Sequence, residues 1–192
     1  AVTMDTARRR PIRSSAVLVV AVLALLAACS SGSGGSKKLA LGTEADVAYT
    51  SPASGSTAAV DTTVGVTVLA VRQGTQDELT AGGIQVDDDA KDATPYYVDV
   101  RYANKGTGAA TRTMTVSMED NKGDDVPTTL IFALDSDPFT KCPDVSTGAF
   151  NPGDTYPGCT LFLVPKGRSA GVVRFVSQAP DATITFTDWE AK

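Results

Sequence analysis

The sequence predicts an all-β domain, a sandwich of two antiparallel β-sheets, which follows an export signal and a linker. From residue 63 onward, apolar side chains recur at every second position in seven short segments, which is the period of strands with one buried face. Residues typical of turns separate these segments. After the signal, no segment has the i, i+3, i+4, i+7 apolar spacing of a helix. Two packed sheets are therefore the expected architecture.

The first 28 residues have the composition of a signal peptide. Four arginines within residues 8–13 precede an uninterrupted run of Ala, Val and Leu at residues 16–28, the order found in secretory signals. A helix of that length rises about 20 Å, whereas the apolar core of a bilayer is about 30 Å thick. We therefore expect residues 1–28 to direct export and then to be removed.

Leu26, Ala27 and Ala28 stand directly before Cys29, and this motif resembles the lipobox of bacterial lipoproteins. In that family the cysteine thiol receives a diacylglycerol, a dedicated signal peptidase cleaves before it, and the new amino group can be acylated. The resemblance implies lipid attachment at Cys29 and a location on the outer face of the cytoplasmic membrane. Two or three acyl chains anchor a protein stably, at about 0.8 kcal/mol per buried CH₂. A soluble secreted protein with an unmodified Cys29 is the alternative.

Residues 29–62 are expected to form a flexible tether rich in Gly, Ser and Ala. Residues 30–36 contain only Ser and Gly, a composition that behaves as a random coil. Leu39–Leu41 and Val47–Tyr49 are short apolar segments that could form a weak leading strand or dock on the domain. We expect the domain itself to cover residues 63–192.

The first strands of the predicted sandwich lie between residues 63 and 118. Alternating apolar residues predict strands at 63–70, 96–103 and 114–118, with a loop-like segment at 81–94. The second of these strands is the clearest. Its expected core residues are Tyr96, Val98, Val100 and Tyr102, whereas Tyr97, Asp99, Arg101 and Ala103 are expected on the opposite face.

Four further strands are expected after a turn at residues 121–124, where Asn and Gly tolerate unusual backbone dihedrals. In the last strand, Ile184 and Phe186 are expected to face the core between threonines. The longest irregular segment, residues 135–158, contains four prolines. The four strands are expected at residues 130–134, 160–164, 171–176 and 182–189.

Cys142 and Cys159 are expected to form a disulfide across this irregular segment. With Cys29 assigned to lipid, they remain as an even pair in an exported, oxidising setting. Closing a loop of this size stabilises the fold by about 3 kcal/mol in the chain-entropy treatment. A redox-active pair is the alternative, but the spacing is far from the C-x-x-C motif.

The composition argues against several classes of function. The net charge is −5, and loss of the arginine-rich signal makes the remainder more acidic, so nucleic-acid binding is not expected. The chain contains no histidine, which removes histidine-based catalytic triads, histidine-ligated zinc and titration near neutral pH. We therefore expect no enzymatic activity, no catalytic residue and no cofactor.

The densest acidic cluster is Asp87, Asp88 and Asp89 together with Asp92. Carboxylates are suitable calcium ligands, but the D-x-D-x-D-G order and the distal Glu of a calcium loop are missing. A solvated loop is the preferred interpretation, and no metal site is predicted. The alternative is a calcium-dependent module or a hydrolytic enzyme that uses residues 87–92. A second acidic turn, at residues 120–125, has the same preferred interpretation.

Two tyrosines are candidates for contact with a partner. Tyr97 lies on the face of its strand opposite the predicted core, and Tyr156 lies in the proline-rich segment. Aromatic rings with a hydroxyl are common at protein interfaces because they combine apolar area with a polar tip. Exposed rings at these two positions could bind a protein or a sugar.

The order of strands and several local motifs resemble the immunoglobulin-like domains of exported bacterial proteins grouped with the secreted immunoprotective antigen, a family of unknown function. The resemblance covers roughly residues 63–189. It implies an immunoglobulin-like β-sandwich outside the cytoplasm and carries over no catalytic residue. The matching segments are Tyr97–Gly106, Met118–Gly123, Asn151–Asp154, Gly158, Leu161–Pro165 and Thr187–Trp189.

Together these observations predict a lipid-anchored extracytoplasmic binding module without catalytic activity. Its expected partners are the membrane, through the N-terminal lipid, and a protein or another component of the cell envelope. An accessory subunit of a larger envelope complex is a further possibility. The sequence does not predict the ligand or the oligomeric state.

Overall fold

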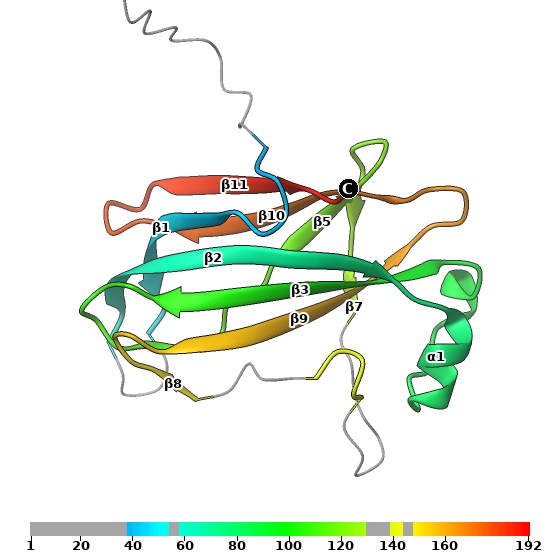
Figure 1. Cartoon of the computed structure of the whole chain (residues 1–192), viewed down its shortest axis with the longest axis horizontal. Coiled ribbons are helices and arrows are strands. Elements are labelled where there is room, and N and C mark those ends of the chain that lie inside the picture. Colours follow the sequence, from blue (N-terminus) through cyan, green and yellow to red (C-terminus); the bar gives the residue numbers. More distant parts are fainter. Residues whose placement is uncertain (1–37, 54–57, 130–138, 144–147) are drawn as a thin grey trace, which may run out of the picture. The chain divides into compact units, whose positions relative to one another are not determined.

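The computed structural model describes residues 38–53, 58–129, 139–143 and 148–192. Residues 35–192 form one compact unit, in which two antiparallel sheets pack face to face (Figure 1). This arrangement confirms the predicted all-β sandwich. The predicted signal peptide, Cys29 and the strand expected at residues 130–134 lie outside the described residues.

The larger sheet has the strand order β1-β2-β3-β9-β7, and the smaller sheet has the order β11-β10-β5-β6. A short third sheet pairs β4 with β8. The strands are β1 (Glu44–Ser51), β2 (Val60–Gln73), β3 (Thr94–Asn104), β4 (Ala110–Thr111), β5 (Ser117–Asp120), β6 (Asp125–Val126), β7 (Thr128–Thr129), β8 (Ala149–Phe150), β9 (Thr155–Val164), β10 (Ala170–Gln178) and β11 (Ile184–Glu190).

The folded unit begins earlier in the chain than the boundary expected at residue 63. β1 and the start of β2 lie within the segment expected to be a tether, and they pair with each other from Glu44 to Ser51. Val47 and Tyr49 are buried, because the alternation in this segment supplies one apolar face to the sandwich. Further upstream, Leu39 forms a parallel bridge with Trp189. The connection between Cys29 and the fold is therefore short.

The central strands follow the predicted alternation. β3 pairs with β2 on one side and with β9 on the other. Its residues Tyr96, Val98, Val100 and Tyr102 all belong to the main core, as expected. The register between β2 and β3 shifts between Val68 and Ala70, and this bulge leaves Leu69 exposed.

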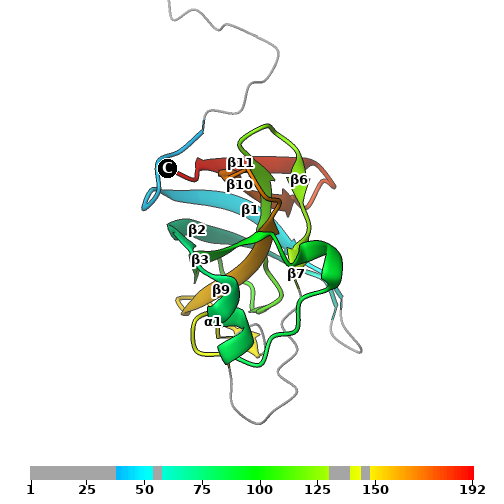
Figure 2. The same ribbon diagram turned by 90° about the vertical axis from the view of Figure 1, so that its right-hand side faces the viewer.

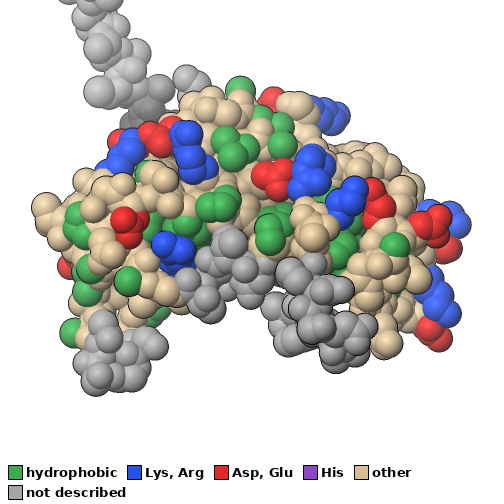
Figure 3. Space-filling view, turned by 60° about the horizontal axis from the view of Figure 1, so that its bottom comes forward, with side chains coloured by type: hydrophobic (Ala, Val, Ile, Leu, Met, Phe, Trp, Pro, Cys, Tyr) green, Lys and Arg blue, Asp and Glu red, His purple; other side chains and the backbone are tan. Residues whose placement is uncertain are grey.

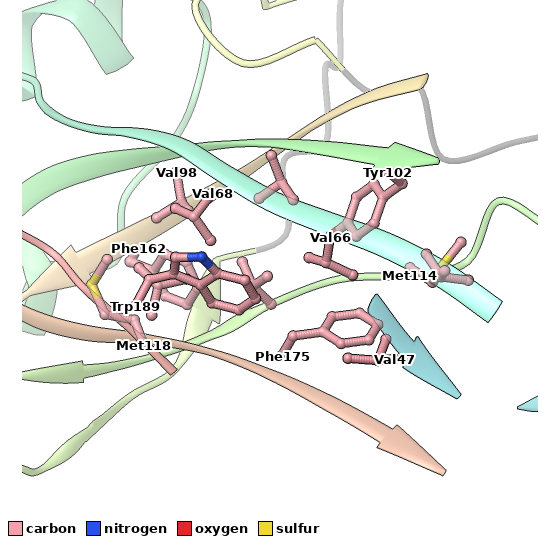
Figure 4. Packing of buried hydrophobic residues seen from close by; sticks show 14 of the residues in the cluster. Val47, Val66, Val68, Val98, Tyr102, Met114, Met118, Phe162, Phe175 and Trp189 are labelled. Carbon is pink, nitrogen blue, oxygen red and sulfur yellow. The ribbon is translucent and has the colours of Figure 1, made fainter. Parts of the chain in front are cut away.

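The core between the sheets is built around large side chains from both layers (Figure 4). Trp189 is fully buried, and its indole N–H donates to the Thr43 carbonyl oxygen at 2.9 Å. This bond satisfies the one polar atom of a side chain that lies in the hydrophobic core. Tyr102 lies between Tyr156 and Phe175, with ring centroids 5.0 and 6.1 Å apart.

The side-chain orientation predicted for β11 is wrong. Ile184 and Phe186 are exposed on the outer face of the smaller sheet, whereas Trp189 occupies the core. Alternation along a strand places residues of even and odd number on opposite faces. Burial of the indole therefore forces Ile184 and Phe186 outward. On the inner face, the Thr185 hydroxyl hydrogen-bonds to the Ser177 hydroxyl at 2.6 Å.

A short helix, α1 (Gln76–Ala81), occurs where the sequence predicted no helix. The Thr75 side chain accepts a hydrogen bond from the Glu78 backbone N–H, and the Glu78 side chain accepts one from the Thr75 N–H. This reciprocal capping box stabilises a helix too short to show periodicity. Figure 2 shows α1 beside β9, on the side of the larger sheet that faces away from β10 and β11.

Two other segments differ from their predicted extents. Met114 and Val116 are buried as expected, but the paired strand β5 begins only at Ser117. The irregular segment expected at residues 135–158 is shorter, because β8 lies inside it and β9 begins at Thr155. β9 pairs with β3 along its whole length, so Thr155–Gly158 continue the sheet.

Candidate functional site

The disulfide predicted between Cys142 and Cys159 is present, with the two Cα atoms 5.2 Å apart. Cys159 lies in β9, and Cys142 belongs to the segment that packs on the outer face of the larger sheet. A second hydrophobic cluster forms there, beneath α1, and it is separate from the main core. Its buried members are Leu79, Ile84, Tyr97, Phe139, Cys142 and Leu161.

Tyr97, expected to be an exposed contact residue, is buried in this second cluster. Its ring packs against Phe139 at a centroid distance of 5.9 Å, and the Arg72 guanidinium lies 5.2 Å from the ring centroid. Burial raises the pKa of the Tyr97 hydroxyl. The outward direction of the side chain was predicted correctly. The cover that α1 and Phe139 provide was not visible in the alternation of β3.

Tyr156 is also buried, and it is not available for contact with a partner. It stands opposite Tyr102 in the β3–β9 ladder, and its ring meets the Phe150 ring edge-on at 4.9 Å. Burial raises the pKa of its hydroxyl well above the ordinary value. The surrounding prolines suggested a loop, but Thr155 and Pro157 are strand residues.

The acidic segment at residues 87–92 is a surface turn that contains a short 3₁₀ helix, Asp88–Ala90. Asp88 forms an ion pair with Lys91 at 2.8 Å, and Asp92 forms one with Lys166 at 3.1 Å. Two of the four carboxylates are thus matched by lysines. In the part of the chain that the structure describes, no group of three or more Cys, Asp or Glu residues has the arrangement of a metal site.

The second acidic turn, between β5 and β6, is held by Arg168. Its guanidinium forms ion pairs with both Asp120 and Asp124. Asp120 also accepts hydrogen bonds from the backbone N–H groups of Lys122 and Asp124. Arg168 and these N–H groups lower the pKa of Asp120 to about 2. Gly123 has φ +85 in this turn, a conformation that glycine adopts without strain.

The outer face of the larger sheet carries a series of ion pairs. Arg72 binds Asp99 at 2.5 Å, Arg101 approaches Glu44 at 3.5 Å, and Lys105 binds both Glu44 and Asp46. In Figure 3, positive and negative side chains lie next to one another across the visible face. Among these described pairs, three cations balance three carboxylates, so together they present no net charge.

The outer face of the smaller sheet has a different character. Val176 stands directly opposite Phe186 in the β10–β11 ladder, and Ile184 follows on the same face of β11. The exposed fractions are 46% for Val176, 58% for Ile184 and 54% for Phe186. We call these three residues the Phe186 patch. A contiguous apolar patch on a domain surface marks a site of interaction more often than isolated exposed residues do.

A charged network borders the Phe186 patch. The Arg174 guanidinium makes a bidentate pair with Asp188, at 2.8 and 3.0 Å, and it binds Glu119 at 2.5 Å. It also lies 5.4 Å from the centroid of the Phe186 ring. These carboxylates raise the pKa of Arg174 above its ordinary value. Arg174 thus supports the ring on one side while two carboxylates neutralise its charge.

A pocket of about 290 Å³ opens beside this face. Tyr49, Met114 and Phe175 supply apolar surface, and Val176 is shared between the pocket and the Phe186 patch. Threonine and serine hydroxyls from residues 113–117 and 128 also line it. The pocket and the patch together form the candidate binding surface.

The sequence contained one signal for this surface that the prediction did not use. Trp189 and Phe186 differ by an odd number of positions, so a strand cannot bury both rings on one face. Tryptophan carries the larger apolar area and was the better candidate for the core. Cys29, the predicted site of lipid attachment, lies outside the described residues.

In the described residues, no helix is both long and apolar enough to cross a bilayer. No family model matches the chain, and no curated protein matches it either. Among solved structures, the fold is similar to MPT63, a secreted protein from Mycobacterium tuberculosis. That comparison has a TM-score of 0.50 and 13% sequence identity, and covers 82% of this chain and 99% of MPT63. The likeness supports the β-sandwich fold. Membership of the family suggested by the sequence motifs remains a prediction.

Proposed function

We propose that this chain is an interaction module without catalytic activity, attached through a lipid on Cys29 to the outer face of the cytoplasmic membrane. The observation that carries the extracytoplasmic part is the disulfide between Cys142 and Cys159. Structural disulfides form in oxidising compartments and are rare in the cytosol. A disulfide-bonded sandwich behind an export-type segment belongs outside the cytoplasm.

The chain around Cys29 supports attachment by lipid. Cys29 follows a leucine and two alanines at the end of an apolar run that is too short to span a bilayer. Leu39 is already bonded to β11. Leu39, the first paired residue of the described part, lies ten positions after the proposed anchor, and ten steps along the chain extend at most about 35 Å. The module would remain close to the membrane surface, where a protein or another envelope component is its expected partner.

The arrangement of charged groups favours a binding role over catalysis. Asp99, Asp120 and Asp188 each pair with an arginine. For Asp120 the pairing lowers the pKa of the carboxyl, which makes it unsuited to general acid catalysis near neutral pH. The chain has no histidine. The candidate binding surface is instead apolar and lined with hydroxyls, which suits recognition by shape and burial.

Mass spectrometry of the mature protein, purified from membranes in detergent, tests the anchor. We expect an N-terminus at Cys29 that carries a diacylglycerol thioether, and recovery in the detergent phase after phase separation. The control is Cys29→Ser, which should accumulate with its signal uncleaved and without lipid. An unmodified Cys29 thiol, or an N-terminus at another residue, would refute the proposed attachment.

Cross-linking in intact membranes, followed by affinity purification, tests the binding role. We expect cross-linked species with the parent protein and fewer of them with Val176→Ser, which alters the residue shared by pocket and patch. The matched control is Leu69→Ser, since Leu69 is equally exposed on the other sheet. Equal capture by the two variants would contradict a role for this surface.

A further inference from the structure

Exposed large apolar residues are concentrated on one face of the described structure. Four such side chains occur in the described part, and three of them form the Phe186 patch. The fourth, Leu69, lies alone on β2 of the larger sheet. Phe186 and Ile184 are both more than half exposed, although burying either side chain would be favourable. The smaller sheet therefore presents apolar area that the fold itself leaves in water.

The connection to the proposed anchor joins the fold at this same strand. The Leu39 N–H donates to the Asp188 carbonyl oxygen at 2.8 Å, and the Glu190 N–H donates to the Leu39 carbonyl oxygen at 2.9 Å. In Figure 1 the described N-terminal residues run beside the β11 end of the sandwich. Phe186 is three residues from Trp189, the partner of Leu39, which corresponds to about 10 Å along a strand.

We propose that the Phe186 patch rests on the lipid surface to which Cys29 is attached, with Phe186 and Ile184 entering the boundary between headgroups and acyl chains. This inference depends on the proposed anchor. A chain of ten residues holds β11 within about 35 Å of the bilayer. Contact between the patch and the membrane is then effectively intramolecular. A patch that is too small to bind lipid from solution is therefore large enough to stay in contact with this membrane.

The charges beside the patch are compatible with a lipid surface. Arg174 forms direct ion pairs with Asp188 and Glu119 and offsets one of their two negative charges. The pairing therefore reduces the repulsion between these carboxylates and anionic headgroups. The three guanidinium nitrogens of Arg174 donate to these carboxylates, which holds the group against the Phe186 ring while the ring enters the apolar layer.

A second copy of the chain fits this surface less well than a membrane does. Leu39 already occupies the edge of β11 beside Trp189. An added strand would then have only the four residues from Ile184 to Thr187, fewer than the five or six of a typical strand. Ile184 and Phe186 also project from the face of the sheet, not from its edge, so a flat apolar layer covers them more completely.

Fluorescence quenching tests the proposal on the full-length lipidated protein. Phe186→Trp serves as the reporter and Leu69→Trp as its matched control, while the native Trp189 stays buried in the core of both. The proteins are reconstituted into vesicles of phosphatidylcholine and phosphatidylglycerol, with bromine on the acyl chains of the phosphatidylcholine. We expect a blue shift and a loss of emission for Phe186→Trp and no change for Leu69→Trp.

A second pair of variants separates a specific patch from general proximity. Val176→Trp reports on the same face, and we expect bromine to quench it in the parent background. The additional changes Ile184→Thr and Phe186→Ser should abolish that quenching while the melting temperature stays unchanged, since both residues are exposed. Persistence of the quenching in this triple variant would overturn the assignment of Phe186 and Ile184.

Flotation of the same vesicles distinguishes failure of the patch from failure of the anchor. If the protein floats but the Phe186→Trp reporter is quenched no more than Leu69→Trp, the anchor stands and the patch proposal is refuted. That result includes the case in which the patch is covered by a protein or a second copy. If the protein does not float, the proposed anchor fails, and the membrane contact fails with it.

Discussion

The outer faces of the two sheets show how similar strands can present different surfaces. The outer face of the larger sheet is covered at one end by α1 and the disulfide cluster, and elsewhere it carries ion pairs such as Arg72 with Asp99. The outer face of the smaller sheet leaves Ile184 and Phe186 in water. Both faces follow alternation, interrupted by one register shift between β2 and β3 and another between β10 and β5. They differ because packing of the core determines which residues of each strand face inward. The residues of the outer face then follow from the alternation and are not selected by the core.

The greatest expected effect on stability comes from changing Trp189, the residue whose burial determines which face of β11 points into the core. Trp189→Ala should lower the free energy of unfolding by about 3–5 kcal/mol, because it leaves a cavity and frees the Thr43 carbonyl. Phe186→Ala, on the outer face of the same strand, should change it by less than about 1 kcal/mol. Urea denaturation measures both. Similar losses for the two variants would contradict the orientation of β11.

The next largest effect concerns the cover on the larger sheet. Replacing Cys142 and Cys159 together by Ala should lower the free energy of unfolding by about 3 kcal/mol, because the unfolded chain gains the freedom of an open loop. Hydrogen exchange should increase first around Leu79 and Tyr97, in the cluster beside the disulfide. Calorimetry of the parent, with and without a reducing agent, provides the control. Equal stability in both conditions would argue against a structural disulfide.

Ion pairs on the two faces should differ in strength. Arg174→Gln should destabilise the fold by about 2 kcal/mol, because Asp188 is only 4% exposed in its side chain and loses a bidentate partner. Arg101→Gln, on the larger sheet, should cost no more than about 0.5 kcal/mol, because that pair is exposed and long. Chemical denaturation at low and high salt compares them. The ranking would be wrong if Arg101→Gln proved the more costly change.

The smallest expected effect is a dependence of stability on acid pH at the β5–β6 turn. The pKa of Asp120 is lowered to about 2 in the folded protein, against about 3.9 for an unfolded Asp. Its stabilising contribution is therefore complete above about pH 4 and is lost as the pH falls toward 2. Titration of the Asp120 carboxyl by NMR measures this shift. Arg168→Gln should raise that pKa, and an unchanged titration in this variant would contradict the pairing.

Much of the fold could be predicted from local patterns. Alternation located β2, β3, β9, β10 and β11, and the cysteine count identified the disulfide. The pattern in β3 placed Tyr96 and Tyr102 in the core correctly. α1 was missed because a helix of six residues has too few turns to show a period, although the capping box at Thr75 and Glu78 was present in the sequence.

The candidate binding surface could not be predicted in the same way. Alternation divides a strand into two sets of residues, and in β11 both sets contain apolar side chains. Which set is buried depends on the opposite sheet, where Val68 and Phe162 lie beside Trp189 (Figure 4). Tyr97 illustrates the same limit, because a segment distant in the sequence supplies its cover.

The sequence by itself determined the class of the domain, the positions of most strands and the pairing of Cys142 with Cys159. These features depend on local periodicity and on the counting of reactive groups, which need no knowledge of neighbours. Only the tertiary structure decided that Tyr97 and Tyr156 are buried, that Ile184 and Phe186 are exposed, and that Leu39 joins β11. Each of these depends on contacts between residues far apart in the chain, because burial is a property of the packed layers and not of any single strand.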